Sequence, residues 1–150
     1  MDFAVNEDQQ LVQELAAQIF GDRCGHERAR ELERAGDWLD EDLWRDLASA
    51  NLTALSVPED LGGSGFGLIE SVLVLVEVGR NCAAAPVFET LILGAMPVAE
   101  FGGQEQRKRW LAPVVDSGAI LTAALNEAGN TNPARPRLRA TRKGSGWRLD

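Results

Sequence analysis

The chain has 150 residues, of which 45% are apolar and 25% charged, and its formal net charge is −8. This size suits one soluble globular unit, and two cysteines without C-x-x-C spacing beside a single histidine argue against a zinc or dithiol site. The acidic balance argues against a nucleic-acid partner, and no apolar run approaches the length of a membrane span, so we expect a soluble cytoplasmic protein.

The predicted elements begin with a helix near the N-terminus. Asn6 followed by Gln9 matches the capping-box pattern, in which each side chain bonds to the backbone of the other. The helix should run to about Gly21 or Cys24. Apolar residues line one side of this helix, which we expect to be buried: Leu11, Leu15 and Ile19 on one face, with Val12 and Ala16 beside them. No basic segment precedes an apolar one here, so no secretory signal is expected.

Two shorter helices are predicted next. Residues 27–34 are mostly charged and should form a surface helix that stops at Gly36. Asp40 then caps a third helix. Its buried stripe should consist of Leu43, Trp44, Leu47 and Ala48.

A loop rich in glycine leads into a fourth helix. Residues 58–67 combine one proline with four glycines, so this loop can bend tightly and let another backbone or a flat ligand approach. A phosphate-binding loop is not favoured, because no strand precedes it and no lysine follows. The helix over 68–78 is apolar on nearly every side, which predicts the most buried element. Glu70 and Glu77 share one of its faces and should meet water or an arginine.

Two further helices are expected over 87–101 and 104–115. Pro97 lies inside the first of them and should kink it or split it in two. In the second, Trp110, Leu111 and Val114 are predicted to face the core.

The pattern changes after residue 118. Residues 120–126 read as a buried strand, 138–142 as an alternating strand, and 144–146 as a hairpin turn into 147–150. The predicted fold is mainly α: a bundle of about five to six helices over 1–118, then the first strands of a β domain over 119–150. Such an incomplete sheet leaves open edges, so we expect a fragment of a longer protein.

Three segments carry a resemblance to one family. The loop and helix over 57–80 read P-E-x-x-G-G-x-G and end in Glu-Val-Gly-Arg; residues 102–118 read GGQEQRKRWLAPVVDSG; residues 1–10 are similar to an opening helix. Taken in their order along the chain, these segments resemble the N-terminal region of the flavin-dependent acyl-CoA dehydrogenases. The resemblance implies a helical domain followed by a β-barrel-like middle domain.

The resemblance also implies a reaction. Such enzymes remove the α-proton of an acyl-CoA with a carboxylate base while the β-hydride passes to FAD, and the product is a trans-2-enoyl-CoA. Electrons then leave to an electron-transfer flavoprotein or a similar acceptor, and the subunits assemble as homo- or heterotetramers. The base usually comes from a C-terminal bundle, so no catalytic residue is assigned here, and we expect this segment alone to be inactive.

One turn is the candidate cofactor site. Residues 126–133 stand where the family carries [ST]-E-P-x-x-G-S-D, so the resemblance assigns FAD contacts to Leu125, Asn126 and Asn132. Glu127 and Gly129 fit that pattern. Asn126 replaces a hydroxyl with an amide, while other changes remove the proline, serine and aspartate. With these departures, the turn resembles that of a subunit with a degenerate flavin site. Such subunits occur in heteromeric actinobacterial dehydrogenases that act on sterol-derived thioesters.

Three functions therefore remain open: a subunit contributing to an active flavin site, a partner subunit whose own flavin pocket is weak, or a cofactor-free helical interaction module. The basic tail leaves a further choice open. It can face cofactor or thioester phosphates, or it can form a solvated strand face or contact an acidic surface. Its basic residues are Arg135, Arg137, Arg139, Arg142, Lys143 and Arg148.

Overall fold

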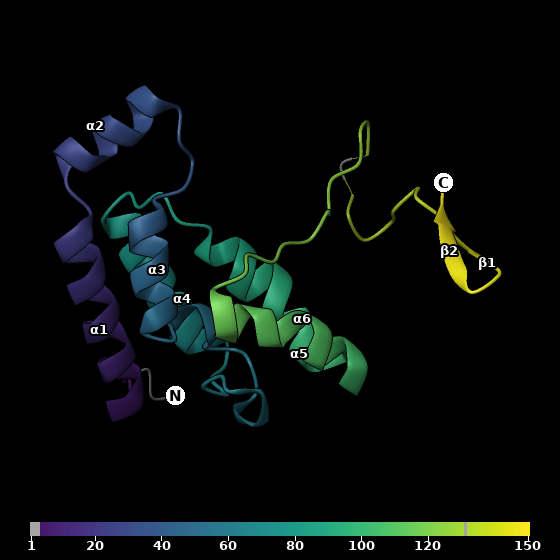
Figure 1. The fold of residues 1–150 in the computed structure, drawn as a ribbon, viewed down its shortest axis with the longest axis horizontal. Helices are drawn as coiled ribbons and strands as arrows, with labels where there is room; N and C mark the ends of the chain where they lie inside the picture. Colours follow the sequence, from purple (N-terminus) through teal and green to yellow (C-terminus); the bar gives the residue numbers. More distant parts are fainter. Residues whose placement is uncertain (1–3, 131) are drawn as a thin grey trace.

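Helices form the body of the molecule, and residues 119–150 extend away from it (Figure 1). The computed structural model describes residues 4–130 and 132–150. These form α1 (Glu7–Arg23), α2 (His26–Ala35), α3 (Glu41–Ser49), α4 (Leu68–Arg80), α5 (Met96–Phe101) and α6 (Gln104–Ser117). Two 3-10 turns, η1 (Leu52–Ala54) and η2 (Glu59–Leu61), precede α4, and a π-helix, η3 (Glu89–Ala95), precedes α5. The architecture confirms the predicted fold class.

The helix ends follow the local sequence signals. The Asn6 side chain accepts a hydrogen bond from the Gln9 N–H at 2.8 Å, and Gln9 Oε1 accepts one from the Asn6 N–H at 3.0 Å, so the predicted capping box is present. Asp40 caps α3 by accepting from the Leu43 N–H. Gly36 ends α2 with φ 74°, a left-handed conformation that favours glycine.

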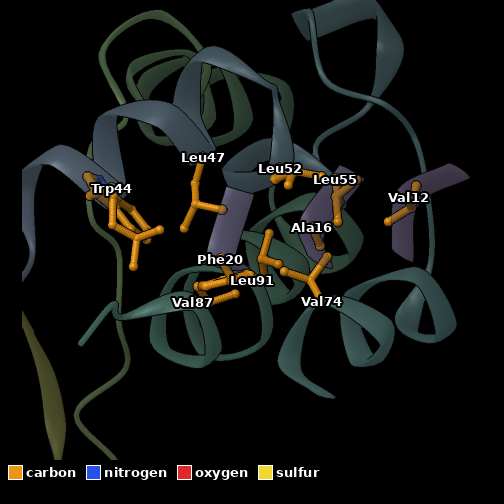
Figure 2. Close-up of a cluster of buried hydrophobic side chains, with 11 residues drawn as sticks. Val12, Ala16, Phe20, Trp44, Leu47, Leu52, Leu55, Val74, Val87 and Leu91 are labelled. Carbon is orange, nitrogen blue, oxygen red and sulfur yellow. The ribbon is translucent and has the colours of Figure 1, made fainter. Parts of the chain in front are cut away.

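The main core lies between α1, α3, α4 and η3, and Figure 2 shows side chains from these elements pointing toward one another. The face that α1 buries differs from the prediction. Leu11 and Leu15 are 63% and 39% exposed, whereas Val12, Ala16 and Phe20 are buried. The apolar stripe of α1 is wide enough to offer two neighbouring faces, and packing against α3 and α4 selects the second.

The prediction that α4 is the most buried element is wrong for the described chain. Its inner face buries Ser71, Val74 and Glu77. Its outer face exposes Leu68, Ile69, Val72 and Val76, each by more than 40%. Apolar residues all round a helix show that both faces suit burial, but burial also needs a covering element, and only the inner face has one here.

The split that was one of the two effects expected of Pro97 in the helix over 87–101 is absent, since these residues stay helical without a break and Ala95 and Met96 are both right-handed helical. The first half is the π-helix η3, in which the Met96 N–H bonds to the Leu91 carbonyl five residues back, and the second half is α5 with the proline near its start. Leu111 and Val114 of α6 are buried, as predicted, but Trp110 is 46% exposed, so its prediction is wrong. A second core cluster joins these helices to the chain before η2: Ala54, Val57, Ala95, Leu111 and Val114.

The β part is one antiparallel hairpin that lies apart from the helices (Figure 1). Strands β1 (Ala140–Lys143) and β2 (Gly146–Leu149) pair through a turn at Gly144, which has φ 62°, and both strands are exposed throughout. The buried strand predicted over 120–126 is absent from the described residues, since a strand forms only against a partner. Among the described residues, no helix combines the length and apolar character needed to cross a membrane.

Candidate functional site

The candidate site starts where the chain leaves α6. Gly118 ends this helix in the left-handed region with φ 63°. Its carbonyl accepts a buried hydrogen bond of 2.7 Å from the indole Nε1–H of Trp44 in α3. This contact joins residues that are 74 positions apart and attaches the exit point of the chain to the helical body.

A pocket of about 390 Å³ lies between the segment that follows α6 and the helices. Its walls come from η3, α5, α6 and the extended segment after α6. Apolar side chains dominate the lining, which suits an apolar group of moderate size. The lining residues are Leu93, Gly94, Pro97, Val98, Trp110, Leu121, Thr122 and Ala123. Sequence reasoning missed this pocket, because its two walls are about 25 residues apart along the chain.

Two of the three predicted FAD contacts follow this pocket directly. Leu125 is 52% exposed and Asn126 is also exposed. Neither backbone forms a hydrogen bond with any other described residue. Their N–H and C=O groups therefore remain available to an external partner.

Asn132, the third predicted contact, lies farther along in the turn. Its backbone N–H donates to Asn130 Oδ1, and its own Oδ1 accepts from the Ala134 N–H, both at 3.1 Å. The side-chain oxygen is thus used inside the turn, which leaves the amide NH₂ group for a ligand. Thr131, within the same predicted site, lies outside the described residues.

The carboxylate of Glu127 organises this turn. It accepts from the backbone N–H groups of Arg137 at 2.8 Å and Leu138 at 2.9 Å, and from the Asn130 side chain at 2.8 Å. The Arg137 N–H, the Asn130 amide and the Leu138 N–H together hold the pKa of Glu127 below its usual value. The resemblance matched Glu127 to the family pattern, but only the fold reveals that its carboxylate ties residues 127–138 into a loop.

Replacing Glu127 with glutamine should loosen this loop, because one acceptor oxygen becomes a donor facing backbone N–H groups. Amide exchange at Arg137 and Leu138 should then accelerate in the variant. In the wild type, the same loss of protection should appear only as the pH falls through the lowered pKa of Glu127, since the ionised form is the one bonded. Exchange measured by NMR across acid pH tests this. Protection factors at Arg137 and Leu138 that are equally high in both proteins at every acid pH would contradict the role of the carboxylate.

The acidic residues of α4 have structural partners. Glu70 accepts from the Gly67 N–H at 2.9 Å and from the Gln9 amide at 2.8 Å. Burial raises its pKa, but these bonds outweigh burial and the net pKa is lowered. Buried Glu77 bonds to Arg80 at 2.6 Å. The arginine predicted for Glu77 is confirmed, whereas the partners that the described chain gives Glu70 are Gln9 and the Gly67 backbone N–H, and no arginine.

The tail from 135 to 150 keeps its basic side chains exposed. Arg148 pairs with Asp150 at 2.6 Å, and this pair is itself exposed. The hairpin in this tail lies apart from the helices (Figure 1), so its positive charge faces away from the helical body.

The residues around the turn fit a flavin in part. Unpaired backbone groups at Leu125 and Asn126 suit the polar edge of a ring, and the neighbouring apolar pocket suits a flat or aliphatic group. Asn132 can add a donor. The arrangement can therefore hold a planar ligand mainly through backbone contacts.

Comparison with known proteins identifies a consistent set of relatives. The family model described as acyl-CoA dehydrogenase, N-terminal domain, matches residues 6–118. The chain is 37% identical over 149 residues to the acyl-CoA dehydrogenase FadE27 of Mycobacterium tuberculosis, covering 99% of this chain and 39% of that protein. It thus spans about two fifths of the length of this curated relative.

Two solved structures share the fold closely. The steroid ACAD Tcur3481-Tcur3483, as a G363A variant, superposes with a TM-score of 0.87 at 43% identity, over 95% of this chain and 39% of that one. The ChsE4-ChsE5 complex from Mycobacterium tuberculosis superposes with a TM-score of 0.86 at 37% identity, over 99% of this chain and 40% of that one.

Proposed function

Because this chain belongs to the acyl-CoA dehydrogenase family, we propose that it is part of a subunit of a flavin-dependent enzyme that desaturates an acyl-CoA thioester to a trans-2-enoyl-CoA. One observation carries the proposal within the structure. The apolar pocket of about 390 Å³ ends at Leu121–Ala123, and unpaired backbone groups at Leu125 and Asn126 follow directly. This arrangement supports the proposal that a flavin ring binds next to a cavity suited to an apolar substrate.

The proposed roles of the residues follow from this placement. Backbone groups of Leu125 and Asn126, with the side chain of Asn132, would hold FAD, which when bound accepts the β-hydride of the thioester while a base takes the α-proton. The apolar lining around Leu93 and Leu121 excludes water from the reacting carbons. Glu70 and Glu77 are engaged in structural bonds, so we assign the base to a part of the enzyme outside this chain.

A heteromeric enzyme is the second candidate within this function. The turn over 126–133 lacks the hydroxyl, proline and aspartate of the family pattern, which favours a partner subunit whose own flavin site is weak. A lost buried hydrogen-bond partner costs about 1–3 kcal/mol, or roughly ten- to a hundredfold in affinity. Relatives named as a two-protein complex and as a steroid ACAD support a heteromer acting on sterol-derived acyl-CoA. From the family resemblance we further propose a heterotetramer in the cytoplasm, with an electron-transfer flavoprotein or a similar acceptor.

The visible absorption spectrum of the complete polypeptide tests the proposal. It is recorded on the protein purified alone and again after co-expression with a second dehydrogenase subunit. Given the altered turn, we expect flavin bands only after co-expression, and these bands should bleach anaerobically when an acyl-CoA is added. Bands in the protein alone would indicate a self-sufficient site and reject the weak-site candidate. Absence of bands from both preparations would reject flavin binding and favour an interaction module.

A further inference from the structure

The segment between α6 and the candidate turn touches the helical body at two defined points. The first is the hydrogen bond from Trp44 to Gly118. The second lies three residues later, where Leu121 packs against Gly94 in η3. Between these points the chain is extended and forms no ladder, so the two contacts, rather than a sheet, determine its course.

The contact at Gly94 leaves no room for a side chain. A Cβ at this position would lie 2.8 Å from the carbonyl carbon of Leu121 and 3.0 Å from its oxygen, and closer still to the Leu121 Cβ. The first two atoms belong to the backbone, so a side-chain rotation cannot relieve the clash. Gly94 is buried and its φ is negative, so its conformation does not require glycine. It is the close approach of Leu121 that requires a glycine at this position.

The helix around Gly94 is also unusual. It belongs to the π-helix η3, whose wider turn is rare and is frequent at functional sites. Leu93, Gly94 and Leu121 all line the pocket. The position of Leu121 against η3 therefore contributes to the shape of this pocket.

Leu121 also sets the starting point of the candidate turn. Leu125 and Asn126 follow four and five residues later, about 13–17 Å of extended chain. A shift of Leu121 away from η3 is passed directly to these residues, because no intervening hydrogen bond to the described chain absorbs it.

We propose that Gly94 is a positioning residue: by admitting Leu121 against η3, it holds the segment 121–126 where the turn can meet a flavin ring. The flavin part of this inference rests on the proposed function. The docking of the segment stands on the geometry alone.

The test is Gly94→Ala in the complete polypeptide with its partner subunit. Limited proteolysis within 119–126 should become about tenfold faster or more, since overpacking displaces the segment from η3, while α1 and α3 stay resistant to cleavage. Flavin content per protein should fall in parallel. Gly79→Ala is the matched control, because this helical glycine has no atom within 4 Å of an added Cβ, so both readouts should match the wild type.

A second variant separates positioning from general damage. Leu121→Ala leaves η3 unchanged but removes most of the side chain that packs against it, so cleavage within 119–126 should again rise and flavin content should again fall. Unchanged cleavage within 119–126 in Gly94→Ala would overturn the proposal, as would a Leu121→Ala protein that behaves like the wild type. If the wild type holds no flavin, the proposed function fails, and the cleavage readout still decides whether Gly94 positions the segment.

Discussion

Replacing Gly63 with alanine is expected to destabilise the fold by about 3 kcal/mol, the upper end of the usual range for overpacking a tight contact. A Cβ at Gly63 would collide with the carbonyl oxygen and Cβ of Val57 and would lie 2.6 Å from the carbonyl carbon. Val57 is fully buried in the second core cluster. The loop is further fixed there by the bond from the Gly65 N–H to the Val57 carbonyl at 2.9 Å, so neither backbone can withdraw at low cost.

Urea denaturation measures this loss as a lower transition midpoint. Gly21→Ala in α1 is the control, because no atom lies within 4 Å of its added Cβ. Alanine should there stabilise the helix by about 0.5–1 kcal/mol. A Gly63→Ala protein as stable as the wild type would show that the loop over 57–67 relaxes freely, and the close-approach interpretation would then be wrong.

Removing the Asp40 carboxylate is expected to be the next most damaging change. Asp40 is 3% exposed and receives two bonds from the Arg28 guanidinium, at 2.8 and 3.0 Å, and one from the Leu43 N–H. Its own N–H donates to the Ala84 carbonyl at 2.8 Å. One residue thus connects α2, the start of α3 and the chain that follows α4. Losing the cap and the charge-assisted bonds in Asp40→Ala should cost about 2–3 kcal/mol.

The pH dependence of stability gives an independent check. Chiefly the Arg28 bond, aided by the Leu43 N–H and opposed by burial, holds the pKa of Asp40 below its usual value. The stabilisation is therefore fully present above the unfolded aspartate pKa of about 4 and is lost as the pH falls through the lower folded value.

Asp40→Asn is the matched variant, because it keeps an oxygen for the cap but cannot ionise. The free energy of unfolding of the wild type should exceed that of Asp40→Asn by a constant amount near neutral pH. The difference should shrink on acidification below the unfolded pKa. A difference that persists unchanged in acid would mean that the charge of Asp40 contributes nothing.

Local signals in the sequence predicted helix ends well. Asn6 and Asp40 cap the helices they were expected to cap, and Gly36 ends α2. Each of these signals acts through hydrogen bonds or backbone angles within a few residues. Neighbours in the sequence are therefore sufficient to predict them.

Predictions of burial succeeded less often. Leu15 and Trp110 have suitable spacing yet are exposed, and the outer face of α4 has no cover within the described chain. Periodicity identifies which faces are apolar, but the number of apolar faces exceeds the number of covering elements. The predicted strand over 120–126 failed for a related reason, since its ladder requires a partner strand that no local pattern can supply.

The candidate site divides in the same way. The resemblance carried by three segments located the turn over 126–133 and its departures from the family pattern, which concern residue identity alone. The bond from Trp44 to Gly118, the approach of Leu121 to Gly94 and the carboxylate of Glu127 beneath the turn all emerged from the structure.

The sequence by itself therefore determined the family, the helical elements, their ends and the location of the altered turn, because these depend on short-range hydrogen bonding and on residue identity. Only the tertiary structure decided which faces are buried, how Asp40 joins three segments, and where the pocket and its exit segment lie. These contacts join residues distant along the chain. Their geometry depends on how complete helices pack, and the spacing of residues within one helix does not contain that information.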